Sequence, residues 1–455
     1  MLHQSTKEAI KVGLAVALSI TAAFWLGWDK AYWAVITVFM IAATESYSHA
    51  IAKSRNRILG TLVGSVYAIF LLGSFAQNYI LFITFYTLFL AFCVFMSSHK
   101  KFGYAFTMAF TVNVIVACSG GFNGDYSFSL AILRIQETLL GVLSYSFIFR
   151  FIWPIKTEDI FFDLFSSVTH KIKKTIALQG NNSEEQDTLV VDQNPELLEQ
   201  LQKLHEMLNL PLLDSPRLAH ERKYWRFSLN SIEKLNSLLQ DKTQGKNIDE
   251  SDLDKGVSLF SESLLSPKSS YTELQQWYTY ENKKDHVTLN VQNHFNIPLR
   301  QRLKNVFKAV SVLVTCLIIW IYFPIPGGYI MPLIASIYAN VLAEHSNKVV
   351  NLSALAMVAG CIIFTAQYVF LMPTLTEIWQ LAGLYALNAF FIWKGCSTPS
   401  LAPLRLLGGN FLVILTMGAL QLTPSYQVES SLLMIPLFYI CLAVTYFYNK
   451  LYQVN

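Results

Sequence analysis

Twelve apolar runs, six on each side of a polar central stretch, restrict most strongly what this chain can fold into. A helix needs about 20 mostly apolar residues to cross the hydrocarbon core of a bilayer. Apolar residues make up 53% of the sequence and charged residues 14%, whereas soluble domains carry roughly a quarter charged residues. We therefore predict an all-α polytopic membrane protein. The predicted spans cover residues 8–27, 31–46, 57–75, 79–97, 103–119 and 128–152, and then 305–323, 329–344, 350–371, 377–393, 405–421 and 429–448.

The loop cations are distributed unequally between the two faces of the membrane. Short cytoplasmic loops collect Lys and Arg, and with the N-terminus inside nearly all of these residues, Arg57 among them, fall on one face. The other face receives Lys30 together with Asp29, Asp125, Glu377 and Glu429. This asymmetry predicts that both termini lie in the cytoplasm.

The same alternation divides the chain into three parts. Residues 1–154 and residues 301–455 each hold six predicted spans, and residues 155–300 lie between them on the cytoplasmic side. This central part repeats apolar residues at helical spacing and is interrupted by polar connectors that contain Gly and Asn. We predict two six-helix transmembrane modules that flank a helical cytoplasmic insert.

The two predicted modules resemble each other at a spacing of 296 to 297 residues. AYWAVITVFMIAATES (31–46) aligns with GYIMPLIASIYANVLA (328–343), so that Tyr32 falls on Tyr329. Because six is even, both modules begin and end inside and would form a parallel repeat. Such repeats are common in secondary transporters, whose sites lie near the midplane between the repeats.

The stretch RNRILGTLVGS (55–65) carries cations directly before an apolar run. Gly60 and Gly64 form a GxxxG pattern, which lets a second helix approach closely within a membrane. With Arg57 and Thr61 they predict a helix-packing surface whose cytoplasmic end is held by the cations. Packing within the chain and contact with a second copy are both compatible with this pattern.

Two stretches carry a family likeness. KAYWAVITVFMIAATES followed by RNRILGTLVGS, and the later RIQETLLGVLSYSFIFRFIWP, resemble the fusaric acid resistance and aromatic acid exporter family. The likeness includes the R-x-x-G-T-x-x-G pattern and covers residues 5–155 well and the rest loosely. The second module lacks the R-x-x-G-T signature, since it reads VVNLSALAMVAG there.

The resemblance implies a function that composition alone does not indicate. It implies efflux of small aromatic or related organic acids across the bacterial inner membrane, driven by the proton gradient. The partners that it implies are a small organic acid, membrane lipid, a second copy in a homodimer and a periplasmic membrane-fusion protein. A related plant branch conducts organic anions, so a passive organic-anion channel is the first alternative. A non-transporting scaffold with a partner-binding cytoplasmic domain is the second.

Arg134 and Glu137 are the strongest candidates for the site, because charges inside a predicted span are costly and face a partner or a wet cavity. Their i, i+3 spacing places them on one helix face, where they can pair. The functional hypothesis is that Arg134 binds a substrate carboxylate and that Glu137 couples its movement to that of a proton. The alternatives are a fixed structural ion pair and an arginine that snorkels to the headgroups.

Further polar residues fall at or inside predicted spans. Glu45 and Glu344, at equivalent cytoplasmic ends, are candidates for proton coupling. Thr111, Asn113 and Asn410 are candidates for substrate binding along a polar route. Such groups also join helices to each other without contacting any substrate.

No recognised motif for catalysis, a cofactor or a metal occurs in the sequence. It contains no GxxxxGK[ST], HExxH or GxSxG, and its six cysteines are widely spaced without a CxxC pair. RKYWRF (222–227) mixes cations with aromatic residues but lacks the wider basic field of a nucleic-acid-binding surface. We predict no enzymatic activity, no cofactor, no metal and no nucleic-acid partner.

Overall fold

The computed structural model describes residues 3–44, 46–121, 123–154, 156–179, 194–212, 214–243, 258, 271–284, 295–342, 345–398 and 401–453. The chain divides into two compact units. The larger, here the transmembrane unit, comprises Met1–Thr44, Lys53–Pro154 and Asn293–Asn455. The smaller, here the insert unit, comprises Glu45–Ala52 and Ile155–Gln292.

Six helices form the first part of the transmembrane unit, of which α3 begins with residues of the insert unit, up to Ala52. They are α1 (Gln4–Trp25), α2 (Tyr32–Ala42), α3 (Tyr47–Phe75), α4 (Tyr79–Ser97), α5 (Gly103–Gly120) and α6 (Gly124–Phe151). Its second part contains α14 (Leu299–Tyr322), α15 (Ile330–Val341), α16 (Asn347–Ala366), α17 (Ile378–Gly395), α18 (Ala402–Leu415) and α19 (Val428–Gln453). A π-helical turn at Gln367–Leu371 and a 3₁₀ turn at Met372–Thr374 extend α16. A second 3₁₀ turn, Met417–Leu420, follows α18.

A helix forms in each of the twelve predicted runs, but not every helix has the length of a full span. Within the described residues, eight helices are long and apolar enough to cross a membrane. Three others, α2, α15 and α18, are apolar but shorter, and α17 is not among the eight. The structure therefore supports a multi-pass, all-helical membrane protein but not twelve full-length spans.

The two shortest helices show why apolar length overestimates a span. α2 has 11 residues and α15 has 12, which at 1.5 Å per residue gives about 17 and 18 Å, against about 30 Å of hydrocarbon. Residues 43 and 44 of the first run lie beyond the end of α2. Before α15, Gly327 and Gly328 have φ angles of 102° and 54°, a left-handed backbone that glycine adopts readily.

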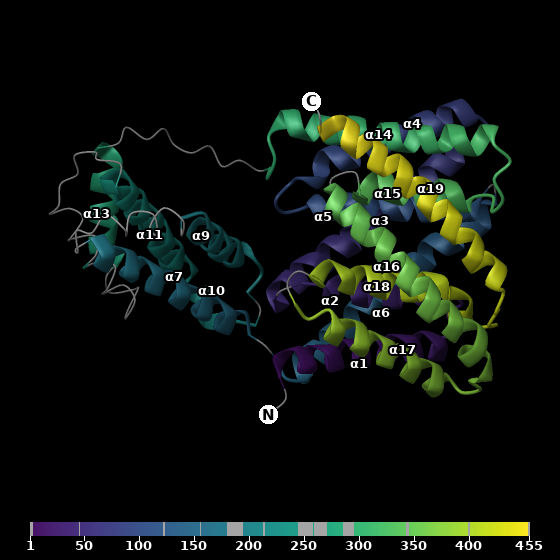
Figure 1. The fold of residues 1–455 in the computed structure, drawn as a ribbon, viewed down its shortest axis with the longest axis horizontal. Coiled ribbons are helices and arrows are strands. Elements are labelled where there is room, and N and C mark those ends of the chain that lie inside the picture. Colours follow the sequence, from purple (N-terminus) through teal and green to yellow (C-terminus); the bar gives the residue numbers. More distant parts are fainter. Residues whose placement is uncertain are drawn as a thin grey trace. The chain divides into compact units, whose positions relative to one another are not determined.

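Helices of the transmembrane unit pack in a regular set of pairs. α1 packs against α17, and α4 packs against α14, as their positions in Figure 1 show. In the same way α2 packs against α18, and α5 packs against α15. α6 packs against α1, α2 and α5. Large apolar side chains stay exposed on several of these helices, for example Val66, Leu143 and Ile362, which suits surfaces that face lipid.

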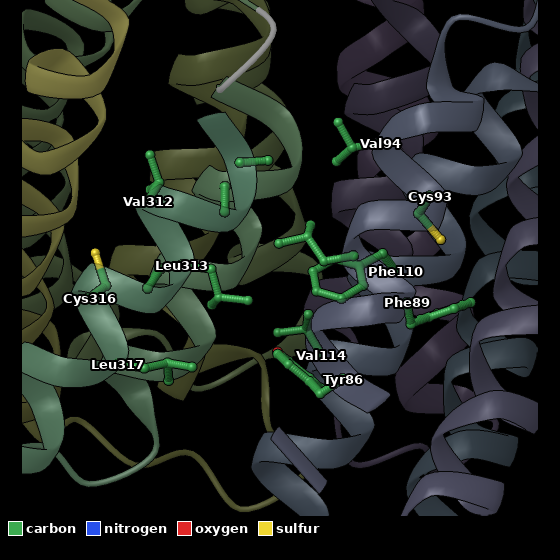
Figure 2. Close-up of a cluster of buried hydrophobic side chains, with 14 of the residues drawn as sticks. Tyr86, Phe89, Cys93, Val94, Phe110, Val114, Val312, Leu313, Cys316 and Leu317 are labelled. Carbon is green, nitrogen blue, oxygen red and sulfur yellow. The ribbon is translucent and has the colours of Figure 1, made fainter. Parts of the chain in front are cut away.

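One apolar core joins the two parts of the transmembrane unit (Figure 2). It contains Tyr86, Phe89 and Cys93 of α4, and Phe110 and Val114 of α5. α14 contributes Val312, Leu313, Cys316 and Leu317. The Tyr86 hydroxyl donates a 2.7 Å hydrogen bond to Ser336 Oγ of α15, so its buried polar tip is satisfied inside an otherwise apolar core.

The insert unit is also helical. Among its described residues the helices are α7 (Thr157–Gln179), α9 (Asn194–Asn209), α10 (Pro216–His220), α11 (Arg222–Thr243) and α13 (Tyr271–Lys284). They pack around a core of Phe161, Phe165, Leu201, Trp225, Leu229 and further apolar residues.

The N-terminus of α7 is capped from within the insert unit. The Thr157 amide donates to Asp214 Oδ2 at 2.6 Å, and the Glu158 amide donates to Ser215 Oγ at 3.0 Å. These contacts satisfy two amides that the helix itself leaves free. The Ser48 hydroxyl, at the start of α3, donates to Asp214 Oδ1 at 2.9 Å.

Candidate functional site

The close packing of α2 against α6 brings the charged residues of the predicted site together. Gly141 of α6 makes this approach possible, because a Cβ at this position would lie 2.6 Å from the Ala34 carbonyl oxygen and 2.6 Å from Thr37 Cβ. Small residues of this kind let helices associate closely where lipid supplies no hydrophobic driving force between them.

Arg134 and Glu137 form an ion pair on α6. The helix begins at Gly124, where the Asn123 side chain accepts from the Tyr126 amide. Arg134 therefore lies ten residues into α6, about 15 Å along its axis, and not near its end. The side chains of Arg134 and Glu137 are 3% and 0% exposed. At this depth the arginine does not reach the helix end.

Trp33 completes the immediate surroundings of the pair. The Arg134 guanidinium carbon lies 4.2 Å from the centre of the Trp33 ring, within the range of a cation–π interaction. Arg134 Nε and Glu137 Oε1 have no hydrogen-bond partner among the described residues. Buried polar atoms nearly always find a partner, so these two atoms mark where a polar ligand or water can bind.

Arg57 of α3 is also buried in this region, while its place at the cytoplasmic end of a span stays a prediction. α3 begins at Tyr47, so that Arg57 is ten residues into the helix, where it is 7% exposed. Its Nε donates to Thr37 Oγ1 at 3.1 Å, and its Nη1 donates to the Tyr104 hydroxyl at 3.0 Å. Hydropathy begins the predicted span at residue 57 because the first turns of α3 are polar, whereas the helix itself begins at Tyr47.

The remaining residues of the R-x-x-G-T-x-x-G pattern line the contact of α3 with α5 and α6. A Cβ at Gly60 would lie 2.4 Å from the Ala105 carbonyl oxygen, and one at Gly64 would lie 2.2 Å from that of Ala109. The Thr61 and Thr138 hydroxyl oxygens are 3.4 Å apart. The pattern thus joins α3 to α5 through its glycines and to α6 through its threonine.

The predicted polar route is not gathered around Arg134. Asn340 of α15 donates to Thr111 Oγ1 at 3.2 Å, which ties Thr111 to α15. Asn113 is two residues further along α5, about 200° around the helix, and points to the other side. Within the described part of the chain, no hydrogen bond or ion pair joins Thr111, Asn113 or Asn410 to Arg134.

Two of these side chains are nevertheless unusual. Both amide atoms of Asn113, which is fully buried, and the Asn410 carbonyl oxygen lack a hydrogen-bond partner among the described residues. The candidate proton-coupling residues Glu45 and Glu344 lie outside the described residues.

Lys30, which the sequence predicts to lie in a loop, is beside α6. Its ammonium donates to the Tyr126 hydroxyl at 2.9 Å, and its backbone pairs with that of Gln421. Partial burial lowers the pKa of Lys30, but the hydrogen bond to Tyr126 and the neighbouring Tyr32 outweigh it, and the net shift is upward. Lys30 is therefore charged at neutral pH. The isolated cation between two apolar runs was the only sequence signal for this contact.

Comparison with known proteins identifies the family of this chain. The model of the fusaric acid resistance protein family matches residues 8–247, which is more than half of the chain. The chain belongs to this family. Its membership agrees with the resemblance that the R-x-x-G-T pattern and the closing helix of the first module indicated.

Two curated relatives of this family member match over part of their length. The uncharacterized transporter YdhK of Escherichia coli (strain K12) is 27% identical over 141 residues, 30% of this chain and 21% of the relative. The p-hydroxybenzoic acid efflux pump subunit AaeB of Edwardsiella tarda (strain FL6-60) is 27% identical over 157 residues, 31% of this chain and 24% of the relative. The matches thus span about a quarter or less of these relatives. No solved structure matches the chain.

Proposed function

We propose that this member of the fusaric acid resistance protein family exports small aromatic or related organic acids across the bacterial inner membrane, driven by the proton gradient. The observation that carries the proposal is the buried Arg134–Glu137 pair stacked on Trp33. Support also comes from the relative named as a p-hydroxybenzoic acid efflux pump subunit.

The chemistry of the first step is competition for one guanidinium. A guanidinium holds a carboxylate through two parallel N–H···O bonds, and Arg134 has an Nε without a partner among the described residues. A substrate carboxylate that binds there displaces Glu137. Trp33 already covers one face of the guanidinium, so the carboxylate approaches along the edge of the group.

Proton coupling follows from the burial of Glu137. Once displaced from Arg134, the 0%-exposed carboxylate has lost its counter-charge. Burial disfavours an unpaired charge, so the carboxylate takes up a proton. When the substrate leaves, the ion pair re-forms and Glu137 gives up the proton. For the inward proton gradient to drive export, Glu137 must take this proton from the periplasmic side and release it to the cytoplasm, opposite to the movement of the acid. Each cycle then links the movement of one carboxylate to one protonation event.

The helix contacts support two six-helix modules, residues 1–154 and 301–455, around the insert of residues 155–300. If α14–α19 correspond in order to α1–α6, exchanging the two modules turns the α1–α17 contact into an α14–α4 contact. It likewise turns the α2–α18 contact into an α15–α5 contact. All four contacts occur. The ends of these pairs agree as well. Lys394 of α17 donates to Ser5 Oγ of α1 at 2.9 Å, and Arg302 of α14 donates to the Phe95 carbonyl of α4 at 3.2 Å.

The short helices α2 and α15 fall at corresponding positions in these modules. Paired short hydrophobic segments of this kind indicate the binding region in transporters built from repeats. In the first module α2 supplies Trp33 and Thr37 to the charged site. Thr111 and Asn113 of α5 in the same module, and Asn410 of α18 in the second module, are proposed to contact the substrate further along its route. Glu45 and Glu344 are proposed to exchange protons at the cytoplasmic ends.

We propose that both termini and the insert lie in the cytoplasm, where the cations of the loops gather. A homodimer embedded in membrane lipid, joined to a periplasmic membrane-fusion protein, would complete the export path. The apolar side chains exposed on α3, α4 and α6 offer surfaces on which a second copy or lipid can pack.

The test is uptake of a panel of labelled aromatic carboxylates, including p-hydroxybenzoate, into proteoliposomes with and without an imposed pH gradient. The unchanged protein is compared with Arg134→Ala, and Arg302→Gln serves as a control that alters a buried arginine on another helix. Gradient-dependent flux that is lost only in Arg134→Ala supports the proposal. Flux that ignores the gradient identifies a passive anion channel. Absence of flux for every acid rejects transport and leaves a scaffold.

A further inference from the structure

Two guanidiniums and one carboxylate are buried where α2, α3 and α6 meet. Arg57 is 7% exposed and Arg134 is 3% exposed. Glu137 is the only fully buried acidic side chain among the described residues. The cluster therefore carries one positive charge that no buried carboxylate balances.

The unbalanced charge belongs to Arg57. Its hydrogen-bond acceptors among the described residues are all neutral. They are Thr37 Oγ1 at 3.1 Å, the Tyr104 hydroxyl at 3.0 Å and the weakly accepting Met108 sulfur at 3.2 Å. In the part of the chain that the structure describes, Arg57 forms no ion pair. Glu137 is bound to the other arginine.

The two arginines lie at different depths along the same helix contact. Thr61 of α3 contacts Thr138 of α6. Arg57, four residues before Thr61, bonds to Thr37. Thr37 in turn lies against Gly141, three residues after Thr138. α3 and α6 therefore run in opposite directions. Arg57 and Arg134 lie on either side of the Thr61–Thr138 contact, about 12 Å apart along the axes at 1.5 Å per residue.

Arg134 stacks on Trp33, at the end of α2 that follows Lys30. Arg57 bonds to Thr37, one helical turn further along α2. An anion that travels along this contact thus meets Arg57 and Arg134 in sequence, with the hydroxyls of Thr61 and Thr138 between them. A charge removed from water without a counter-charge is costly, and intramembrane charges typically face an ion path or a partner.

We propose that Arg57 is a second carboxylate-binding residue, which holds the transported acid on the α2–α3 side before or after Arg134 holds it beside Trp33. This inference rests on the proposed export function for the identity of the anion. It changes the role of Arg57 from a helix-packing residue, as its sequence pattern indicates, to a contact with the substrate. It also gives the R-x-x-G-T pattern two tasks, close packing through its glycines and anion binding through its arginine.

The test measures binding by the full chain in detergent and does not depend on transport. Thermal unfolding is followed at low ionic strength, with and without benzoate, and separately with chloride. Arg57→Gln is compared with the unchanged protein and with Arg302→Gln. Arg302 is also a buried arginine, but it bonds to the Phe95 carbonyl and lies between the Phe95 and Phe295 rings.

We expect Arg57→Gln without anion to unfold at the same temperature as the unchanged protein or higher, because a buried charge without a counter-charge has been removed. We expect its apparent affinity for benzoate to fall by about tenfold or more, since a hydrogen bond to a charged group contributes roughly that factor. Arg302→Gln should keep the benzoate response of the unchanged protein, whatever its own stability.

Two results would overturn the inference. If Arg57→Gln unfolds at a lower temperature without anion and keeps its benzoate response, Arg57 is a structural donor that joins α2, α3 and α5. If chloride stabilises the protein through Arg57 and benzoate does not, the site holds an inorganic ion and not the transported acid.

The outcomes also separate this inference from the proposed function. Benzoate binding lost in Arg57→Gln, together with flux that ignores a pH gradient, keeps the binding residue and rejects coupled export. Gradient-driven flux lost in Arg134→Ala, together with an unchanged benzoate response in Arg57→Gln, keeps export and rejects the second binding residue.

Discussion

A guanidinium and a carboxylate that are both removed from water stabilise each other only as a pair. Each side chain of Arg134 and Glu137 is almost fully buried, and the desolvation of each charge costs several kcal/mol unless the other balances it. Trp33 adds a cation–π contact on one face of the guanidinium. The site is therefore sensitive to the loss of one partner and tolerant of the loss of both.

Glu137→Gln should lower the free energy of unfolding by about 3–5 kcal/mol, because it leaves the Arg134 charge buried without its partner. The double substitution Arg134→Met with Glu137→Leu should cost less than Glu137→Gln alone, since it removes both charges and keeps the volume. Denaturant unfolding in detergent measures both values. A double substitution that costs as much as the sum of the two single ones would contradict this account of the pair.

The sequence predicted the Arg134–Glu137 pair because i, i+3 spacing within an apolar run leaves two charges few other partners. It did not predict Trp33 as a stacking partner, because contacts between helices depend on rotation about each axis, which a single sequence does not reveal. The burial of Arg57 was missed for a local reason. Hydropathy begins the third span at residue 57, whereas hydrogen bonding begins the helix at Tyr47.

At the scale of helices, the seam between α3 and α5 depends on two missing side chains. The backbone of α5 lies so close to Gly60 and Gly64 that a Cβ would fall 2.4 and 2.2 Å from its carbonyl oxygens. Neither oxygen can yield without moving the helix. This close approach also fixes Tyr104, at the start of α5, within hydrogen-bond distance of Arg57.

Gly64→Ala should therefore reduce the free energy of unfolding by about 1–3 kcal/mol, the usual cost of overpacking. Gly73→Ala provides a matched control on the same helix, because no atom lies within 4 Å of its added Cβ. The control should be neutral or more stable by about 0.5–1 kcal/mol, since alanine favours a helix over glycine. Thermal unfolding of the two variants side by side measures the difference, and equal effects would rule out the seam.

The existence of the helices was predictable, and the length of several was not. Apolar runs identified a helix in each of the twelve predicted segments. In lipid, the polar backbone groups of such a run find no water, so they must form their hydrogen bonds within the helix. α2 and α15 nevertheless end after 11 and 12 residues. Composition cannot distinguish a helix that crosses lipid from a shorter one enclosed by its neighbours.

At the scale of the whole molecule, the distribution of cations predicts how the chain enters the membrane. Lys100 follows α4 and Asp125 begins α6, and both side chains are exposed. If both termini lie inside, the loop that contains Lys100 faces the cytoplasm and the start of α6 faces the periplasm. The direction of the proposed carboxylate path, from Arg57 towards Arg134 on export, depends on this orientation.

Single cysteines introduced as Lys100→Cys and Asp125→Cys test the orientation in cells, after replacement of the six native cysteines. A membrane-impermeant maleimide should label Asp125→Cys in intact spheroplasts and Lys100→Cys only after permeabilisation. The reverse pattern of labelling would invert the topology and with it the direction of transport through the site.

The family and the membrane class of the molecule were predictable from two short motifs and composition. The alignment between the two halves of the sequence, in contrast, rests on few residues. It is supported more strongly by the helix packing, because the α1–α17 contact corresponds to the α14–α4 contact. The substrate depends on groups whose position is set by packing, and for that reason the charged site has to be tested by flux and not by pattern.

The most direct test of proton-coupled export compares Glu137→Gln with the unchanged protein in proteoliposomes loaded with a labelled aromatic acid. Efflux is recorded with and without an imposed pH gradient, and the internal pH is followed in the same vesicles. The account predicts that the gradient accelerates efflux and moves protons in the unchanged protein, and that Glu137→Gln loses the gradient dependence and the linked proton movement. Gradient-driven efflux that persists in a folded Glu137→Gln would contradict the assignment of proton coupling to this site.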